Sequence, residues 1–218
     1  MHHALERGIE TLKTANPDLH IPDLKVLLLL GDPTNRHFME EVKGLSAFGG
    51  ISGYIVISVW PTIDVLNRLE AIVVHELHHN VRYSPGGVVW DPVTVTVGEH
   101  VVAEGLADVF ATELYGSHGY THFVDDQTRN DDSVLAKVAS GLQVTGMQDF
   151  AAWVLGDKTA QLFGAEPVGL PTGAGYAAGV RLVSEYLHLH GGTAASNVHT
   201  PVETVLSDVL PRLGLGDE

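Results

Sequence analysis

The stretch His75-Glu76-Leu77-His78-His79 constrains this chain most, because it places the pattern H-E-x-x-H inside residues 62–81, which have helical periodicity. In a helix the imidazoles of His75 and His79 lie one turn apart on the same face, so both can bind one Zn²⁺. Glu76 then lies beside the metal, where a general base deprotonates a zinc-bound water. Composition alone gives roughly 0.05 accidental matches to so short a pattern, so the surrounding sequence must decide.

A third ligand must come from elsewhere, since catalytic zinc sites usually have three protein ligands and one position open to water. The metzincin pattern is absent, because Arg82 and Pro85 stand where glycine and histidine are required. The next predicted helix, residues 99–115, offers Glu104. His100 lies one turn earlier on the same face and is the alternative third ligand.

Asp108 favours Glu104 over His100. It follows Glu104 by one turn on the same face, where it can accept the second ring N–H of a ligating histidine, with His75 as the first candidate. Gly105 and its small neighbours would let two helices approach closely. The residues therefore predict a zinc centre of His75, His79 and Glu104, with Asp108 supporting a ligand and Zn²⁺ as the cofactor.

Composition limits the other possibilities. The chain has 218 residues, no cysteine and a formal net charge of −15. Histidine and carboxylate must supply any metal ligands, and no nucleic-acid partner is expected, because such a partner requires a basic surface. Apolar runs such as Val26 to Leu30 are too short to span a bilayer, and the N-terminus has no apolar signal region. We expect a cytoplasmic protein with no membrane segment, and the sequence does not define its oligomeric state.

Strand and helix patterns are distributed unequally. Residues 24–30 predict a buried strand and residues 54–59 a second strand, whereas residues 117–132 predict a polar surface loop. Helical periodicity recurs in four later segments, residues 133–144, 147–155, 174–190 and 201–210. We predict an α+β fold with a small N-terminal mixed sheet packed on the active-site helix and a mainly helical C-terminal half. Residues 1–218 are expected to form one domain, with an α/β part at about 1–82 and a helical part at about 98–218.

The motifs resemble those of a known group of enzymes. H-E-x-x-H followed by E-x-x-x-D on a second helix is the signature of gluzincins, the thermolysin-like zinc peptidases. With Gly175-Tyr176-Ala177-Ala178-Gly179, the motifs more closely resemble the YjaZ-like bacterial family of predicted Zn-dependent proteases, over about residues 50–190. This resemblance implies a gluzincin-like fold, with His75, His79 and Glu104 as ligands. It also implies Glu76 as the base and Asp108 as a residue that supports a ligand.

Peptide hydrolysis also needs a group that stabilises the oxyanion of the tetrahedral intermediate. Tyr176 is the candidate, because Gly175 and Gly179 let its helix approach closely, although a core tyrosine at a tight helix crossing fits equally well. His199 is a second candidate. Residues 53–59 are either the sheet edge along which an extended peptide pairs or an ordinary interior strand.

Two further features have ordinary structural interpretations. His78 points away from the ligand face, so we expect it to be structural or exposed. The acidic side chains in and beside the predicted loop are expected to be solvated, with calcium binding as the remote alternative; they are Asp125, Asp126, Asp131 and Asp132.

The function predicted from these residues is that of a zinc metalloprotease acting on a peptide or protein substrate. Peptide bonds would be hydrolysed by a Zn-activated water with Glu76 as the general base. One alternative is a catalytically silent zinc-binding regulatory or interaction protein, against which the intact Glu76 counts. The other is a metal-dependent hydrolase of a small non-peptide substrate, which a deep closed pocket would favour.

Overall fold

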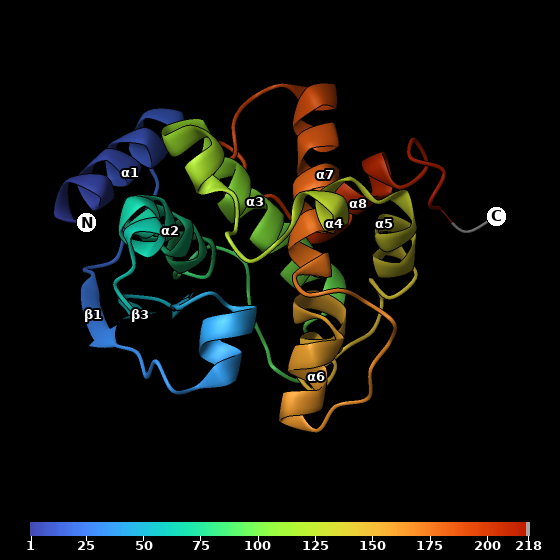
Figure 1. Cartoon of the computed structure of the whole chain (residues 1–218). Helices are drawn as coiled ribbons and strands as arrows, with labels where there is room; N and C mark the ends of the chain where they lie inside the picture. The colour runs from blue at the N-terminus through green and yellow to red at the C-terminus, as the bar shows by residue number, and fades with distance from the viewer. Residues whose placement is uncertain (217–218) are drawn as a thin grey trace. The chain divides into compact units, whose positions relative to one another are not determined.

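The computed structural model describes residues 1–216 and contains one small sheet and a mostly helical remainder (Figure 1). The strands are β1 (Lys25–Leu30), β2 (Leu45–Ile51) and β3 (Tyr54–Val59). The helices are α1 (His2–Ala15), α2 (Ile63–Arg82), α3 (Val97–Tyr115), α4 (Asp126–Asn130), α5 (Asp132–Ala139), α6 (Asp157–Phe163), α7 (Ala174–His190) and α8 (Val202–Val209). Short helical turns are η1 (His37–Glu41), η2 (Gly116–Gly119) and η3 (Ala151–Leu155). The predicted α+β class is confirmed.

Packing divides the chain into two compact units. The first comprises Met1–Val89, Ala107–Phe123 and Gly192–His199, and the second comprises Trp90–Leu106, Val124–Gly191 and the residues from Thr200 onward. Helix α3 belongs to both units, because the division falls within it. The single domain expected over residues 1–218 stays a prediction. Within residues 1–216, no helix has both the length and the apolar character needed to cross a membrane.

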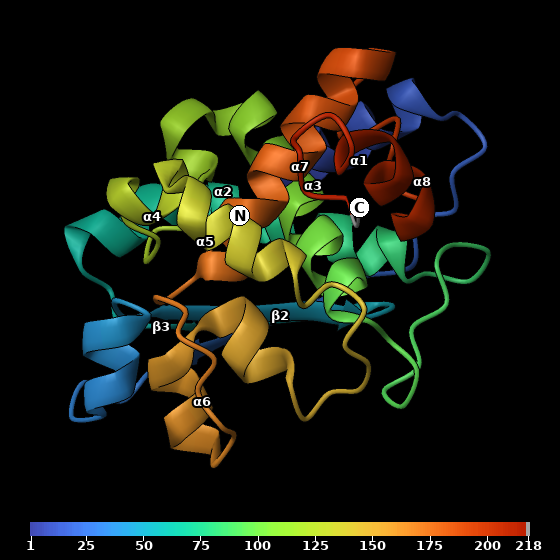
Figure 2. The same cartoon turned by 90° about the vertical axis from the view of Figure 1, so that its right-hand side faces the viewer.

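The sheet of the first unit supports the helix that carries the H-E-x-x-H motif. Its strand order is β1-β3-β2, with β1 parallel and β2 antiparallel to β3. Alternate residues of β3, namely Ile55, Ile57 and Val59, are buried, as a strand with one covered face requires. Helices α1 and α2 lie on that side of the sheet, and α2 packs on β2 and β3 (Figure 2). The predicted packing of a mixed sheet on this helix is confirmed.

Strand β1 is present, but the prediction that it is buried was wrong. All six residues are exposed, and the side chains of Leu27 and Leu30 are 53% and 73% exposed. The reason is its place at the edge of the sheet, beyond the strands on which α2 packs. An apolar run favours burial, but the layers around a strand determine whether burial occurs.

The interior strand is β3, which pairs with β1 on one side and β2 on the other. The hypothesis that a peptide pairs along residues 53–59 is therefore wrong, because both edges of this strand are already used. Strand β2 was not predicted from the sequence. It lies at an edge of the sheet.

In the second unit the long helix α7 packs against α4, α5 and α8 (Figure 1). The segments expected at 174–190 and 201–210 correspond to α7 and α8, whereas α5 ends earlier than expected. Residues 147–155 contain only the π-helical turn η3, and α6 was not predicted.

The predicted loop at 117–132 also contains η2 and α4, so it was only partly correct. Its acidic residues have local roles. Asp125 accepts the Thr128 N–H at 2.7 Å and Asp131 accepts the Ser133 N–H at 2.8 Å, so both carboxylates cap helices. Asp132 accepts from Arg181 at 2.6 Å. These contacts give the three carboxylates local structural roles.

Candidate metal centre

The C-terminal half of α2 carries the motif in the interior of the first unit. Thr62 caps the helix by accepting the N–H of Val65, and every residue from Val73 to Arg82 is buried. Buried histidines must find partners or a metal ion, because burial of an unsatisfied polar group is costly. The motif is thus a buried polar cluster and not a pair of surface histidines.

The two motif histidines face each other. Their Nε2 atoms lie 3.1 Å apart, with the ring planes inclined by 77°. The Nδ1 atom of His75 lies 3.0 Å from Oδ1 of Asp108, and both side chains are less than 5% exposed. Because the carboxylate accepts, Nδ1 carries the proton, and the lone pair of His75 is then on Nε2. The contact expected between Asp108 and His75 is therefore present.

Thr121 completes the surroundings of Asp108, and the sequence analysis missed it. Its hydroxyl donates to Oδ1 at 2.8 Å and its backbone N–H donates to Oδ2 at 3.1 Å. No periodicity links Thr121 to Asp108, so a sequence pattern could not have identified it.

Glu104 is placed by helix continuity. It precedes Asp108 by one turn in α3, so the two side chains lie on the same face of a single helix. One ligand atom from each of His75, His79 and Glu104 lies within 4.8 Å of the others. Nitrogen ligands at tetrahedral zinc are about 3.3 Å apart, from Zn–N distances of about 2.0–2.1 Å. The spacing of the two Nε2 atoms and the chemistry of the donors therefore fit zinc, while the role of each residue as a ligand stays a prediction.

His100, the alternative third ligand, lies outside this group of donors. Its ring packs against those of Phe150 and Trp90, with centroid separations of 4.6 Å and 6.4 Å. Glu104 and not His100 belongs to the candidate group of donors, and the choice between them as a ligand stays a prediction.

Glu76 is buried, with 5% of its surface exposed, in the turn of α2 that lies directly on β2. A Cβ atom on Gly49 of β2 would be 2.3 Å from the backbone carbonyl oxygen of Glu76. Only glycine permits this approach of strand and helix. The structure therefore brings an edge strand to the residue predicted to be the base, whose catalytic role stays a prediction.

Asn80 fixes the hairpin between β2 and β3 to the same helix. Its amide nitrogen lies 2.8–2.9 Å from three backbone carbonyl oxygens, those of Gly49, Ile51 and Tyr54. Its side-chain oxygen accepts the N–H of Gly53 at 2.8 Å. The buried side chain of Asn80, the residue after His79, thus holds the hairpin against α2.

The remaining candidates have separate environments. His78 is fully buried with Nε2 3.3 Å from the carbonyl oxygen of Ala194, and burial lowers its pKa well below the usual range, so it is neutral and structural. His199 donates from Nε2 to the carbonyl of Val81 at 2.9 Å, so this nitrogen is engaged at the end of α2. Tyr176 lies partly exposed in the first turn of α7, and its role stays a prediction.

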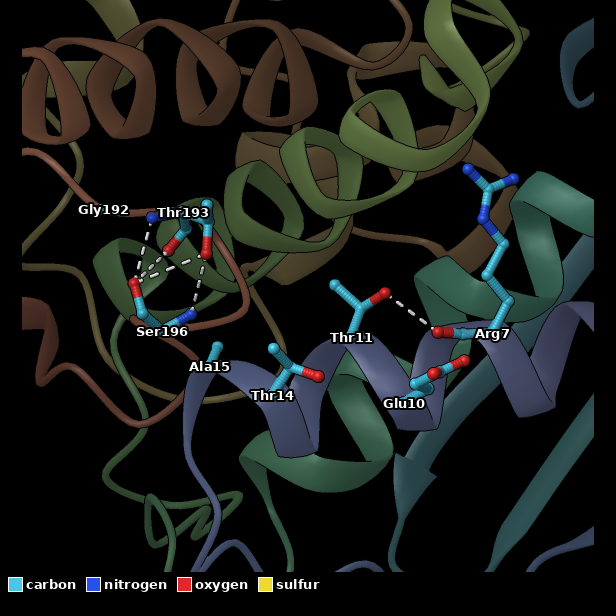
Figure 3. A pocket seen from close by; sticks show the side chains of 8 residues that line it. All are labelled: Arg7, Glu10, Thr11, Thr14, Ala15, Gly192, Thr193 and Ser196. Carbon is cyan, nitrogen blue, oxygen red and sulfur yellow. Dashed lines mark hydrogen bonds between the residues drawn. The ribbon is translucent and has the colours of Figure 1, made fainter.

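A cleft of about 670 Å³ in the first unit lies between α1 and residues 192–196 (Figure 3). Two of its lining residues, Thr193 and Ser196, bond to each other. The N–H of Thr193 donates to Oγ of Ser196, and the N–H of Ser196 donates to Oγ1 of Thr193. None of the eight residues that line it belongs to the predicted zinc centre.

Comparisons with known proteins agree with this geometry. Residues 3–207 match the family described as Predicted Zn-dependent protease (DUF2268). The uncharacterized protein YjfC of Bacillus subtilis (strain 168) is 32% identical over 189 residues, which is 85% of this chain and 60% of that protein. The chain thus covers less than two thirds of this curated relative, and no solved structure matches it. Because the family match covers nearly the whole chain, the chain belongs to this family of predicted Zn-dependent proteases, in agreement with its resemblance to the YjaZ-like group.

Proposed function

We propose that this chain is a zinc-dependent peptidase with His75, His79 and Glu104 as the ligands and Glu76 as the general base. The donor set carries the proposal, because two imidazole nitrogens and one carboxylate oxygen lie within 4.8 Å of one another. Two histidines and a glutamate are the ligands of catalytic zinc sites that keep one position for water. Structural zinc sites are instead closed by four ligands, and this chain has no cysteine to supply them.

Each residue has a defined task in this proposal. Zinc held by these ligands supplies a Lewis acid that polarises the scissile carbonyl and lowers the pKa of a coordinated water. Glu76 accepts a proton from the attacking water and delivers it to the leaving amine. Asp108 keeps the proton of His75 on Nδ1, so that the lone pair of Nε2 would hold the zinc. Tyr176 is the proposed donor to the oxyanion.

The position of β2 supports a peptide as the substrate. β2 lies at the edge of the sheet, and its Gly49 contacts the backbone of Glu76. An extended peptide that pairs with this edge would run past the proposed base, held by backbone hydrogen bonds. A hydrolase of small molecules would be expected to hold its substrate in an enclosed pocket. The cleft in the first unit is lined by α1 and residues 192–196 and not by β2.

The test is a peptide-library digest followed by mass spectrometry, with zinc content measured on the same samples. Glu76→Gln keeps the size of the side chain and removes the base, so zinc content should equal that of the wild type while cleavage is lost. Glu70→Gln is the matched control, because Glu70 is exposed on the same helix. Zinc-loaded wild type that cleaves no peptide would contradict the proposed activity and favour a regulatory zinc protein.

A further inference from the structure

Thr121 holds both oxygens of the carboxylate that orients His75. Its hydroxyl donates to Oδ1 of Asp108 and its backbone N–H donates to Oδ2, at 2.8 Å and 3.1 Å. Oδ1 also lies 3.0 Å from Nδ1 of His75. Thr121 is 5% exposed and Asp108 is 2% exposed, so water has little access to replace either hydrogen bond.

We propose that Thr121 is a positioning residue for the zinc centre, acting through Asp108 on the orientation of His75. This inference rests on the proposed function. A carboxylate held at one oxygen can rotate about its Cβ–Cγ bond, and a histidine bonded to it can follow. Donors on both oxygens remove that freedom, and ligand geometry has to be held within about 0.5 Å to be productive.

The chain around Thr121 is built to bring it back to α3. Two residues earlier, Gly119 lies so close to the helix that a Cβ atom there would be 2.2 Å from the backbone nitrogen of Thr112. The residue after Thr121, His122, donates from Nε2 to the carbonyl oxygen of Val42 at 2.7 Å. The residues on both sides of Thr121 are thus held in place, and this positions Thr121 beside Asp108 in the segment that follows α3.

Zinc affinity of the full chain tests the inference, with zinc alone as the probe in competition against a chromophoric chelator. Thr121→Val removes the hydroxyl at nearly constant size, and Thr121→Ala removes it without placing a methyl group against the carboxylate. Both should bind zinc about 3–10-fold more weakly, somewhat less than the about 10–100-fold cost of losing a direct partner of a ligand. Thr121→Ser keeps the hydroxyl and should remain within about twofold of the wild type. Thr112→Val is the matched control, because its hydroxyl donates to the carbonyl of Val109 within α3.

A double-mutant cycle separates positioning from general destabilisation. Asp108→Asn removes the carboxylate through which Thr121 acts, so adding Thr121→Val should weaken zinc binding by no more than about twofold further. Full additivity of the two losses, or wild-type affinity in both Thr121→Val and Thr121→Ala, would overturn the inference while the zinc centre stands. A wild type that does not bind zinc would overturn the proposed function itself.

Discussion

His122 should make folding stability depend on pH, because it is largely buried in the first unit. Burial is the main cause that lowers the pKa of His122 from 6.5 to about 4, and the positive charges of Arg68 and Lys43 lower it further. The hydrogen bond to Val42 and the charge of Asp108 oppose this shift. The unfolded chain therefore takes up a proton on this histidine first as the pH falls. The contribution of neutral His122 to the free energy of unfolding is fully present above pH 6.5 and is lost as the pH falls toward 4.

The size of the effect follows from the two pKa values. Between pH 7.5 and pH 5, a pKa of 6.5 in the unfolded chain and of about 4 in the folded chain gives a loss of about 2 kcal/mol. Below pH 4 the loss reaches a limit of about 3 kcal/mol. Such a difference is a large part of the free energy of unfolding of a typical domain.

Urea unfolding of the metal-free chain at pH 7.5 and pH 5 measures this loss. His122→Gln can still donate to Val42 but does not titrate, so the wild type should lose about 2 kcal/mol more than this variant between the two pH values. His20→Gln, at an exposed position, should lose as much as the wild type. Equal losses in the wild type and His122→Gln would show that His122 is not the source of the pH dependence.

Three other substitutions test the packing of the first unit. Asn80→Asp places a carboxylate against three hairpin carbonyls, so unfolding in urea should show a loss of about 3–5 kcal/mol; a loss no greater than that of exposed Asn130→Asp would contradict this. Gly49→Ala drives a methyl group against the Glu76 carbonyl and should cost about 1–3 kcal/mol in thermal unfolding, whereas an unchanged midpoint would count against the close contact. Leu27→Lys charges the exposed apolar edge strand, so light scattering should show aggregation at higher concentration than for the wild type, with zinc affinity unchanged. Aggregation at the wild-type concentration would argue that the strand is covered.

The helices at the centre of the account could be predicted because their signals are local. The spacing of His75 and His79, and of Glu104 and Asp108, follows from helical periodicity alone. The expected hydrogen bond between Asp108 and His75 needed only that the two helices approach each other. Gly105 was expected to permit that approach, but it lies against Gly179 of α7 instead.

The missed features depend on contacts distant in sequence. The role of Gly49 could not be predicted, because nothing local in the sequence shows that a helix backbone lies against it. Thr121 lies in a polar stretch where one hydroxyl residue resembles another. The apolar residues of β1 indicated burial, but the sheet ends there and no helix of the described chain packs mainly on it.

X-ray absorption at the zinc edge of the zinc-loaded chain measures which residues bind the metal. The expected spectrum shows one zinc per chain with two imidazole nitrogens at about 2.0–2.1 Å and carboxylate or water oxygens at about 2.0–2.2 Å. His79→Ala should remove one imidazole contribution, and Glu104→Ala should leave both while weakening binding. A spectrum with three imidazoles that loses one in His100→Ala would contradict Glu104 as the third ligand, and failure of the chain to take up zinc would contradict the centre as a whole.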